Sequence, residues 1–192
     1  MRLMFVREFA IITMAAGALF ASAAALGADP FTADSSDLPA GVPIPPRFIF
    51  NGYGCKGQNV SPAIAWSNPP ADTKSFALLV HDPDAPTGGK GWWHWIVVDI
   101  PAATRALAQG AGGTDGRALP APARQLNTDF GTPGWGGPCP PPGDRPHHYV
   151  FTVYALRVDK LSLPANATGA EAQSAADSKA SAKTMFVRLF GR

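Results

Sequence analysis

The features that this chain lacks exclude several classes of protein. None of its 192 residues belongs to a run of lysine or arginine, and the formal net charge is only +2. Nucleic-acid-binding domains usually carry a basic patch or stripe, so we expect no nucleic-acid partner. Beyond residue 28 no segment is apolar and long enough to cross a bilayer. We therefore expect the rest of the chain to be soluble and to have no transmembrane segment.

Compact motifs for catalysis and metal binding are also missing. There is no Gly-x-Ser-x-Gly element of the kind that presents a nucleophilic serine. There is no His-x-x-x-His or Glu-x-x-His element of the kind that holds a metal from one helix. We therefore predict a non-catalytic protein with no cofactor and no bound metal. A hydrolase or a metal-assisted enzyme that uses scattered histidines and carboxylates is the alternative.

The first 28 residues have the order of a secretory signal. Two arginines stand within Met1–Arg7, an apolar stretch covers Phe9–Leu26, and small residues precede Ala28. A basic start, an apolar middle and a small-residue cleavage site define such signals, whereas a retained anchor needs a longer apolar span. We predict a signal peptide over residues 1–28 and a periplasmic or secreted mature protein.

Cysteine is scarce, with only Cys55 and Cys139 present. In an exported chain an even count is first interpreted as one disulfide. Two buried thiols, or a reactive cysteine near His147, are the alternatives. Neither cysteine stands at an expected helix N-terminus that would favour a thiolate. We predict a Cys55–Cys139 disulfide.

Glycine and proline are abundant, with 20 of each, which favours many turns, few long helices and a β-rich fold. Residues 29–46 form an expected extended lead-in to a single domain over residues 47–192. A long loop is expected over residues 110–143, and loops of that length are usually functional. Strands are expected at residues 47–50, 63–66, 75–81, 92–100, 148–157 and 185–190. Helices are expected at residues 101–109 and from Thr168, with a capping box to Glu171, to about Lys183.

The segment Asp82-Pro83-Asp84-Ala85-Pro86 places two carboxylates directly after an apolar strand. Its prolines stiffen the backbone and favour extended conformations, which would hold Asp82 and Asp84 on the same side. Because His94 follows eight residues after Pro86, this region is a candidate site. The expected task of Asp82 and Asp84 is to accept hydrogen bonds from histidine N–H groups or loop amides.

Two further polar groups stand at the ends of expected strands. By the two-residue period, His94 shares a face with Ile96 and Val98, and His147 shares a face with Tyr149 and Phe151. Such a histidine is often an ordinary core residue. Two imidazoles, a phenol and glycine-rich backbone amides can also bind an anion. The same residue types also allow a metal site of two histidines and a carboxylate, but no compact motif supports it.

Several motifs in order resemble the phosphatidylethanolamine-binding protein family in its bacterial Raf-kinase-inhibitor-like form. The first joins the Asp82–Pro86 segment to His94-Trp95-Ile96-Val97-Val98-Asp99-Ile100-Pro101. The second joins Gly136-Gly137-Pro138-Cys139-Pro140-Pro141 to His147-His148-Tyr149-Val150-Phe151. Gly57-Gln58-Asn59-Val60-Ser61-Pro62, with Trp66 just after, is similar to an early motif of the bacterial branch. Together these motifs cover about residues 47–190.

The resemblance implies a mainly β fold, a Greek-key β-sandwich with short peripheral helices that include a C-terminal helix. It also implies an anion pocket for a phosphoryl group such as a phospholipid headgroup, and a homodimer. His148 stands where the family often has arginine, and the loop 142–146 holds an extra Asp144-Arg145. Carried over by motif position, the ligand-binding residues are Asp82, Asp84, Pro86, His94, Gly137, Pro138, His147 and Tyr149.

The resulting functional prediction is an exported, non-enzymatic protein that binds a small anion: phosphate, a phosphorylated headgroup or a carboxylate. A secreted inhibitor or interaction module that acts on a protein partner through the loop 110–143 is a further alternative. Kinase inhibition, known among eukaryotic relatives, is not transferred, because function belongs to sites rather than to folds.

Overall fold

A computed structural model describes residues 29–192, so the predicted signal peptide lies outside the described residues. No helix within residues 29–192 has the length and hydropathy that a bilayer crossing requires. The strands are β1 (Thr32–Asp34), β2 (Asn51–Gly52), β3 (Cys55–Lys56), β4 (Ile64–Ser67), β5 (Ser75–Asp82), β6 (Trp92–Pro101), β7 (Ala106–Leu107), β8 (Arg124–Gln125), β9 (His147–Leu156) and β10 (Ala180–Phe190). The helical elements are the 3-10 turn η1 (Pro46–Phe48) and the helix α1 (Gly169–Lys179).

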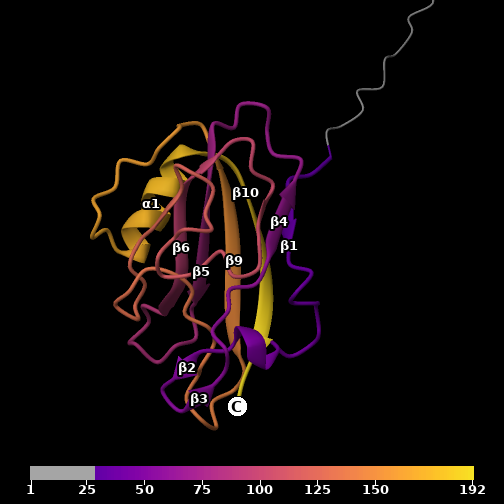
Figure 1. Cartoon of the computed structure of the whole chain (residues 1–192), viewed down its shortest axis with the longest axis vertical. Helices are drawn as coiled ribbons and strands as arrows, with labels where there is room; N and C mark the ends of the chain where they lie inside the picture. Colours follow the sequence, from indigo (N-terminus) through magenta and orange to yellow (C-terminus); the bar gives the residue numbers. More distant parts are fainter. Residues whose placement is uncertain (1–28) are drawn as a thin grey trace, which may run out of the picture.

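Two antiparallel sheets form the body of the fold. The larger sheet has the order β10-β9-β5-β6-β8, and the smaller has the order β1-β4-β7. A separate hairpin pairs β2 with β3. In Figure 1 the helix α1 lies beside β5 and β6, on the far side from β1 and β4. The mainly β architecture and the helix near the C-terminal end agree with the predicted fold class.

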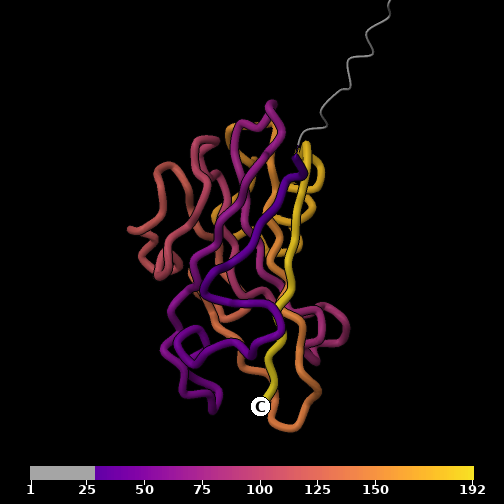
Figure 2. The backbone as a smooth tube through the Cα atoms, turned by 90° about the vertical axis from the view of Figure 1, so that its right-hand side faces the viewer, coloured from indigo at the N-terminus to yellow at the C-terminus, as the bar shows by residue number. Residues whose placement is uncertain are grey.

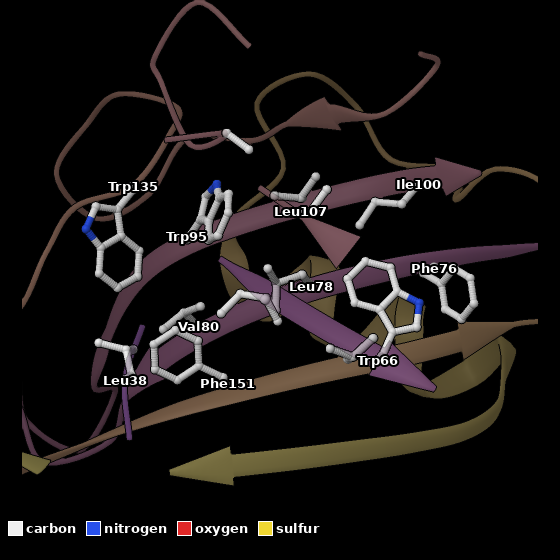
Figure 3. Close-up of a cluster of buried hydrophobic side chains, with 14 of the residues drawn as sticks. Leu38, Trp66, Phe76, Leu78, Val80, Trp95, Ile100, Leu107, Trp135 and Phe151 are labelled. Carbon is white, nitrogen blue, oxygen red and sulfur yellow. The ribbon is translucent and has the colours of Figure 1, made fainter. Parts of the chain in front are cut away.

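The large sheet is buried on both faces. Strand β5 has the sequence SFALLVHD, and apart from His81 all of its residues are buried. Alternate residues point to opposite faces, so one strand supplies two cores. The core between the sheets contains Trp66 of β4 and Leu78 of β5, which Figure 3 shows close together. The other core contains Leu79 of β5, Ile96 of β6 and Ala172 of α1.

Two local expectations are wrong. Residues 101–109 were expected to be helical, but they form a turn and the strand β7, where Ala106 pairs with Ala65. Leu107 is buried in the core between the sheets, and this burial outweighs a weak helical pattern. Residues 47–50 were expected to form a strand, but Pro46 starts the 3-10 turn η1 instead. Proline suits a first helical position because its φ is already set.

The segment 29–46 is joined to β10, an edge strand of the large sheet. The expected lead-in 29–46 contains β1, and Arg188 of β10 donates hydrogen bonds to Asp34 and to the Leu38 carbonyl. The predicted capping box of Thr168 and Glu171 is present, although α1 ends at Lys179 rather than near Lys183. In Figure 2 the C-terminal residue lies beside the loop that follows residue 140, and Gly143 N donates to the Arg192 carbonyl at 3.1 Å.

Two leucines allow a test of where the stability resides. Leu78 is fully buried between the sheets, whereas Leu189 of β10 is 48% exposed. We expect Leu78→Ala to lower the free energy of unfolding by about 2–5 kcal/mol, because it leaves a cavity. Leu189→Ala, the matched control, should change it by about 0.5 kcal/mol or less. Urea denaturation of both variants measures the difference, and equal losses would contradict the assignment of the core.

Candidate functional site

A β-bulge in β6 turns His94 toward the space between the sheets. Val80 of β5 pairs with Trp95, but the next residue, His81, pairs with Trp93. One residue of β6 is therefore unpaired, and the alternation of faces shifts there. The expectation that His94 shares a face with Ile96 is wrong. The His94 ring instead meets Tyr149 of β9, edge to face, at 5.1 Å between centroids.

His94 is held as a neutral imidazole with a defined tautomer. Its Nδ1 lies 2.6 Å from the carbonyl oxygen of Gly136. A carbonyl only accepts, so Nδ1 carries the proton and Nε2 keeps its lone pair. Burial lowers the pKa of His94 to about 4, and this effect outweighs the Gly136 carbonyl, which favours the charged form. Near neutral pH the ring therefore offers an acceptor at Nε2.

His147 pairs with the first aspartate of the Asp82–Pro86 segment. Its Nδ1 lies 2.8 Å from Asp82 Oδ2, and both side chains are almost completely buried. Asp82 Oδ1 also accepts the backbone N–H of Asp84 at 2.8 Å. Asp82 thus fixes the ring of His147 and the turn after β5 together, which is the orienting task expected of it. The Nε2 of His147 lies 3.5 Å from Asp144 Oδ2.

Tyr149 supplies a buried hydroxyl group without a partner. Its side chain is fully buried, and its oxygen has no hydrogen bond within the described part of the chain. Burial, together with the nearby Asp82 and Asp84, raises the pKa of Tyr149. The phenol therefore stays protonated and is available as a donor. An unsatisfied buried donor costs free energy unless a ligand or water occupies the space in front of it.

These side chains surround one cavity of about 210 Å³. Of the predicted ligand-binding residues, those that line it are Asp82, Pro86, His94, His147 and Tyr149. Its other lining residues are Tyr53, Ala85, Thr87, Trp92, Phe130, Cys139, Pro140 and Pro141. Asp82, His94, His147 and Tyr149 lie at the ends of β5, β6 and β9. Trp92 also belongs to β6, and the remaining lining residues come from loops. The structure thus brings together residues that are far apart in the sequence.

The other three predicted residues do not line the cavity. Asp84 Oδ2 accepts the N–H of His148 at 2.8 Å and lies 2.7 Å from its ring Nδ1. These bonds from His148 lower the pKa of Asp84. The Gly137 N–H donates to Asn59 Oδ1 at 2.8 Å, and the Pro138 carbonyl accepts the N–H of Phe50 at 3.2 Å. Asp84, Gly137 and Pro138 thus join neighbouring segments of the chain by hydrogen bonds.

The disulfide brings a distant hairpin to the cavity. Cys55 and Cys139 are bonded, with their Cα atoms 6.0 Å apart, as the even count of cysteines favours. Tyr53 lies in the β2–β3 hairpin beside Cys55, and it was missed as a lining residue. The predicted disulfide carried the signal for it, because Cys139 follows directly after the Gly136–Pro138 motif. Phe130 was also missed, and nothing in the long loop that contains it singles it out.

The donor and acceptor pattern of the cavity is suited to an anion that retains one proton. The hydroxyl of Tyr149 can donate to an anionic oxygen, and Nε2 of His94 can accept from a protonated oxygen. A monoprotonated phosphate or phosphate monoester has both kinds of oxygen. Within residues 29–192 no cluster of three or more histidine, cysteine, aspartate or glutamate side chains is arranged to hold a metal ion.

The fold and this site place the chain among known proteins. The sequence profile described as phosphatidylethanolamine-binding protein matches residues 34–190. The chain belongs to the phosphatidylethanolamine-binding protein family, and its bacterial relatives fit the predicted branch.

Two of these relatives come from Escherichia coli. The UPF0098 protein YbcL is 49% identical over 140 residues, which is 73% of this chain and 76% of YbcL. The UPF0098 protein YbhB is 48% identical, over 71% of this chain and 84% of YbhB. The crystal structure of YbcL, described as a new member of the mammalian PEBP family, superposes with a TM-score of 0.81. That superposition is at 43% identity and covers 84% of this chain and 98% of YbcL.

A third relative comes from a mycobacterium. A Mycobacterium tuberculosis protein named "Putative lipoprotein LppC" is 41% identical over 170 residues, which is 88% of this chain and 77% of that protein.

The pKa of His94 predicts how stability depends on pH. Between the ordinary value of 6.5 and about 4, the unfolded chain binds a proton at this histidine that the folded protein does not. The stability that depends on neutral His94 is therefore complete above pH 6.5 and is lost as the pH falls toward 4. We expect urea unfolding curves to lose up to about 1.4 kcal/mol per pH unit more in the wild type than in His94→Gln. Parallel pH profiles of the two proteins would contradict a neutral, buried His94.

Proposed function

We propose that the protein binds a small anion, a phosphoryl or carboxylate group, in the cavity between β5, β6 and β9. The observation that carries the proposal is the buried Tyr149 hydroxyl, which has no partner within residues 29–192 and lies beside a neutral His94. A buried donor of this kind is satisfied by an anionic oxygen at the same position. Family membership supports the same ligand chemistry, because the family takes its name from a phospholipid headgroup. Free phosphate and a phosphorylated headgroup share that chemistry.

We propose further that the site binds without catalysis. Thr87 and Cys139 supply the aliphatic hydroxyl and the sulfur atom of the cavity lining. The Thr87 hydroxyl lies 2.9 Å from the carbonyl of Gly91, to which it can donate. The sulfur of Cys139 is bonded to Cys55. Neither side chain is arranged next to a base as an activated nucleophile would be.

We propose that this binding takes place outside the cytosol, in the periplasm or after secretion. The support is the order of residues 1–28, the Cys55–Cys139 disulfide and the mycobacterial relative whose name includes a lipoprotein. Disulfides persist in such oxidising compartments and are rare in the cytosol.

Tyr149→Phe separates binding from stability. We expect this change to weaken binding of inorganic phosphate roughly 10- to 100-fold, because a hydrogen bond to a charged group is lost. The free energy of unfolding should stay the same or increase, because the hydroxyl has no partner in the part of the chain that the structure describes. Isothermal titration calorimetry and urea denaturation measure the two quantities.

Tyr154→Phe is the matched control for this prediction. Tyr154 lies on the same strand but belongs to the core under α1, away from the cavity. Its replacement should leave phosphate affinity unchanged. Equal phosphate affinity of the wild type and Tyr149→Phe would overturn the proposed binding mode, and so would the absence of wild-type binding at millimolar phosphate.

The non-catalytic proposal has its own test. Incubation of the purified protein with 4-nitrophenyl acetate and 4-nitrophenyl phosphate should release nitrophenol at the rate of buffer alone. Release above that rate, abolished in His147→Asn, would show a hydrolase that uses the same residues.

A further inference from the structure

An aromatic wall stands at the mouth of the anion site. It consists of Phe50, Tyr53 and Phe130, whose ring centroids lie 4.4 to 6.1 Å apart. The ring planes of these three residues are within 34° of one another, and Tyr53 and Phe130 differ by only 17°. Trp92 meets the Phe130 ring edge to face at 5.5 Å. Tyr53, Phe130 and Trp92 all line the cavity.

The wall continues directly into the polar end of the cavity. The Phe130 ring lies 5.4 Å from the ring of His94, centroid to centroid. Phe130 also lies against Gly136, where a Cβ atom would approach the ring to 2.2 Å. Gly136 is the residue whose carbonyl fixes the His94 tautomer. A ligand held by His94 and Tyr149 is therefore within reach of the wall.

Tyr53 is exposed although its position is fixed. The residue is 68% exposed, more than any other large hydrophobic residue within residues 29–192. Its backbone has a positive φ of 49°, which is uncommon for a bulky side chain. The Cys55–Cys139 disulfide and a hydrogen bond from Arg192 to the Tyr53 carbonyl at 3.1 Å hold the hairpin there. An aromatic ring held in the open beside a binding cavity is available to a ligand.

The cavity has more room than a phosphoryl group needs. A single water requires roughly 10–15 Å³, whereas this cavity measures about 210 Å³. The polar groups lie at one end, and the rest of the lining consists mainly of aromatic residues and of Pro86, Pro140 and Pro141. The lining therefore offers an apolar surface next to the polar groups.

We propose that the natural ligand is an anion attached to a flat aromatic group, such as an aryl phosphate, with its ring against Tyr53 and Phe130. This inference rests on the proposed anion site and adds the class of ligand. Nearly parallel rings offer a platform for a flat partner. An aromatic cage for a quaternary ammonium group would instead surround the cation with ring faces. The apolar lining agrees with a neutral ring rather than a charged body.

Calorimetric titration with phenyl phosphate, methyl phosphate and phosphocholine tests the proposal. We expect phenyl phosphate to bind at least about tenfold more tightly than methyl phosphate, because it gains ring contacts. In Tyr53→Ala the preference should fall to about twofold, because phenyl phosphate loses the ring contact. Tyr53→Phe, the matched control, keeps the ring and should keep the preference. A thermal melt confirms that each variant is folded.

The outcomes separate this inference from the function on which it rests. If all three compounds bind equally and Tyr149→Phe weakens them all, the anion site stands and the aromatic preference is overturned. Tighter binding of phosphocholine than of phenyl phosphate also overturns it, in favour of a cationic body. If none of the three binds up to millimolar concentration, the anion site itself is overturned.

Discussion

The position of β5 inside the large sheet is the constraint on which the site depends. β5 is hydrogen-bonded to β6 on one side and to β9 on the other. This double pairing brings the ends of the three strands together, although His94 and His147 are far apart in the sequence. Asp82, the last residue of β5, then lies next to His147. The cavity is thus a consequence of strand order, and the loops around it enclose a site that the sheet has already assembled.

The polar groups of the cavity lower the stability of the fold, but they are already arranged to bind a ligand. Folding buries the imidazole of His94 in its neutral form, and it leaves the hydroxyl of Tyr149 without a partner among residues 29–192. Both features oppose folding, and both are offset by the two cores of the sheet. Because these groups are already desolvated and oriented, a ligand does not have to order them when it binds. Asp82 orients the ring of His147 by accepting its hydrogen bond.

How far the sequence predicts the structure varies from residue to residue. The apolar run of β5 and the capping box of α1 are local patterns, and both were predicted. His94 was predicted as a site residue but on the wrong face, because a bulge depends on pairing between strands and leaves no mark in the local alternation. Asp84 and Gly137 share motifs with lining residues, yet neither lines the cavity. Their hydrogen-bond partners, His148 and Asn59, are distant in the sequence and come close only in the tertiary fold.

The residues of the aromatic wall were not predicted from the sequence, for a different reason. The cysteine count predicted the disulfide, and the disulfide places the hairpin with Tyr53 at the cavity. The Cys55–Cys139 bond alone does not place the Tyr53 side chain at the cavity, because that position also depends on the geometry of the hairpin. Phe130 gives no such signal, because it is one aromatic residue in a long loop. Its position follows from the close approach to Gly136, which requires the absence of a side chain there.

The disulfide also closes residues 55–139 into a ring, with one segment of the chain before it and a C-terminal tail after it. The ring runs from Cys55 to Cys139 and contains β5 and β6, whereas His147 and Tyr149 lie on β9 in the tail. A molecule in which only the ring has folded has half of a cavity. The cavity is complete only when β9 is paired with β5, because β9 carries His147 and Tyr149. Ligand occupancy is therefore thermodynamically linked to completion of the sheet, and a bound ligand opposes local opening of the C-terminal strands.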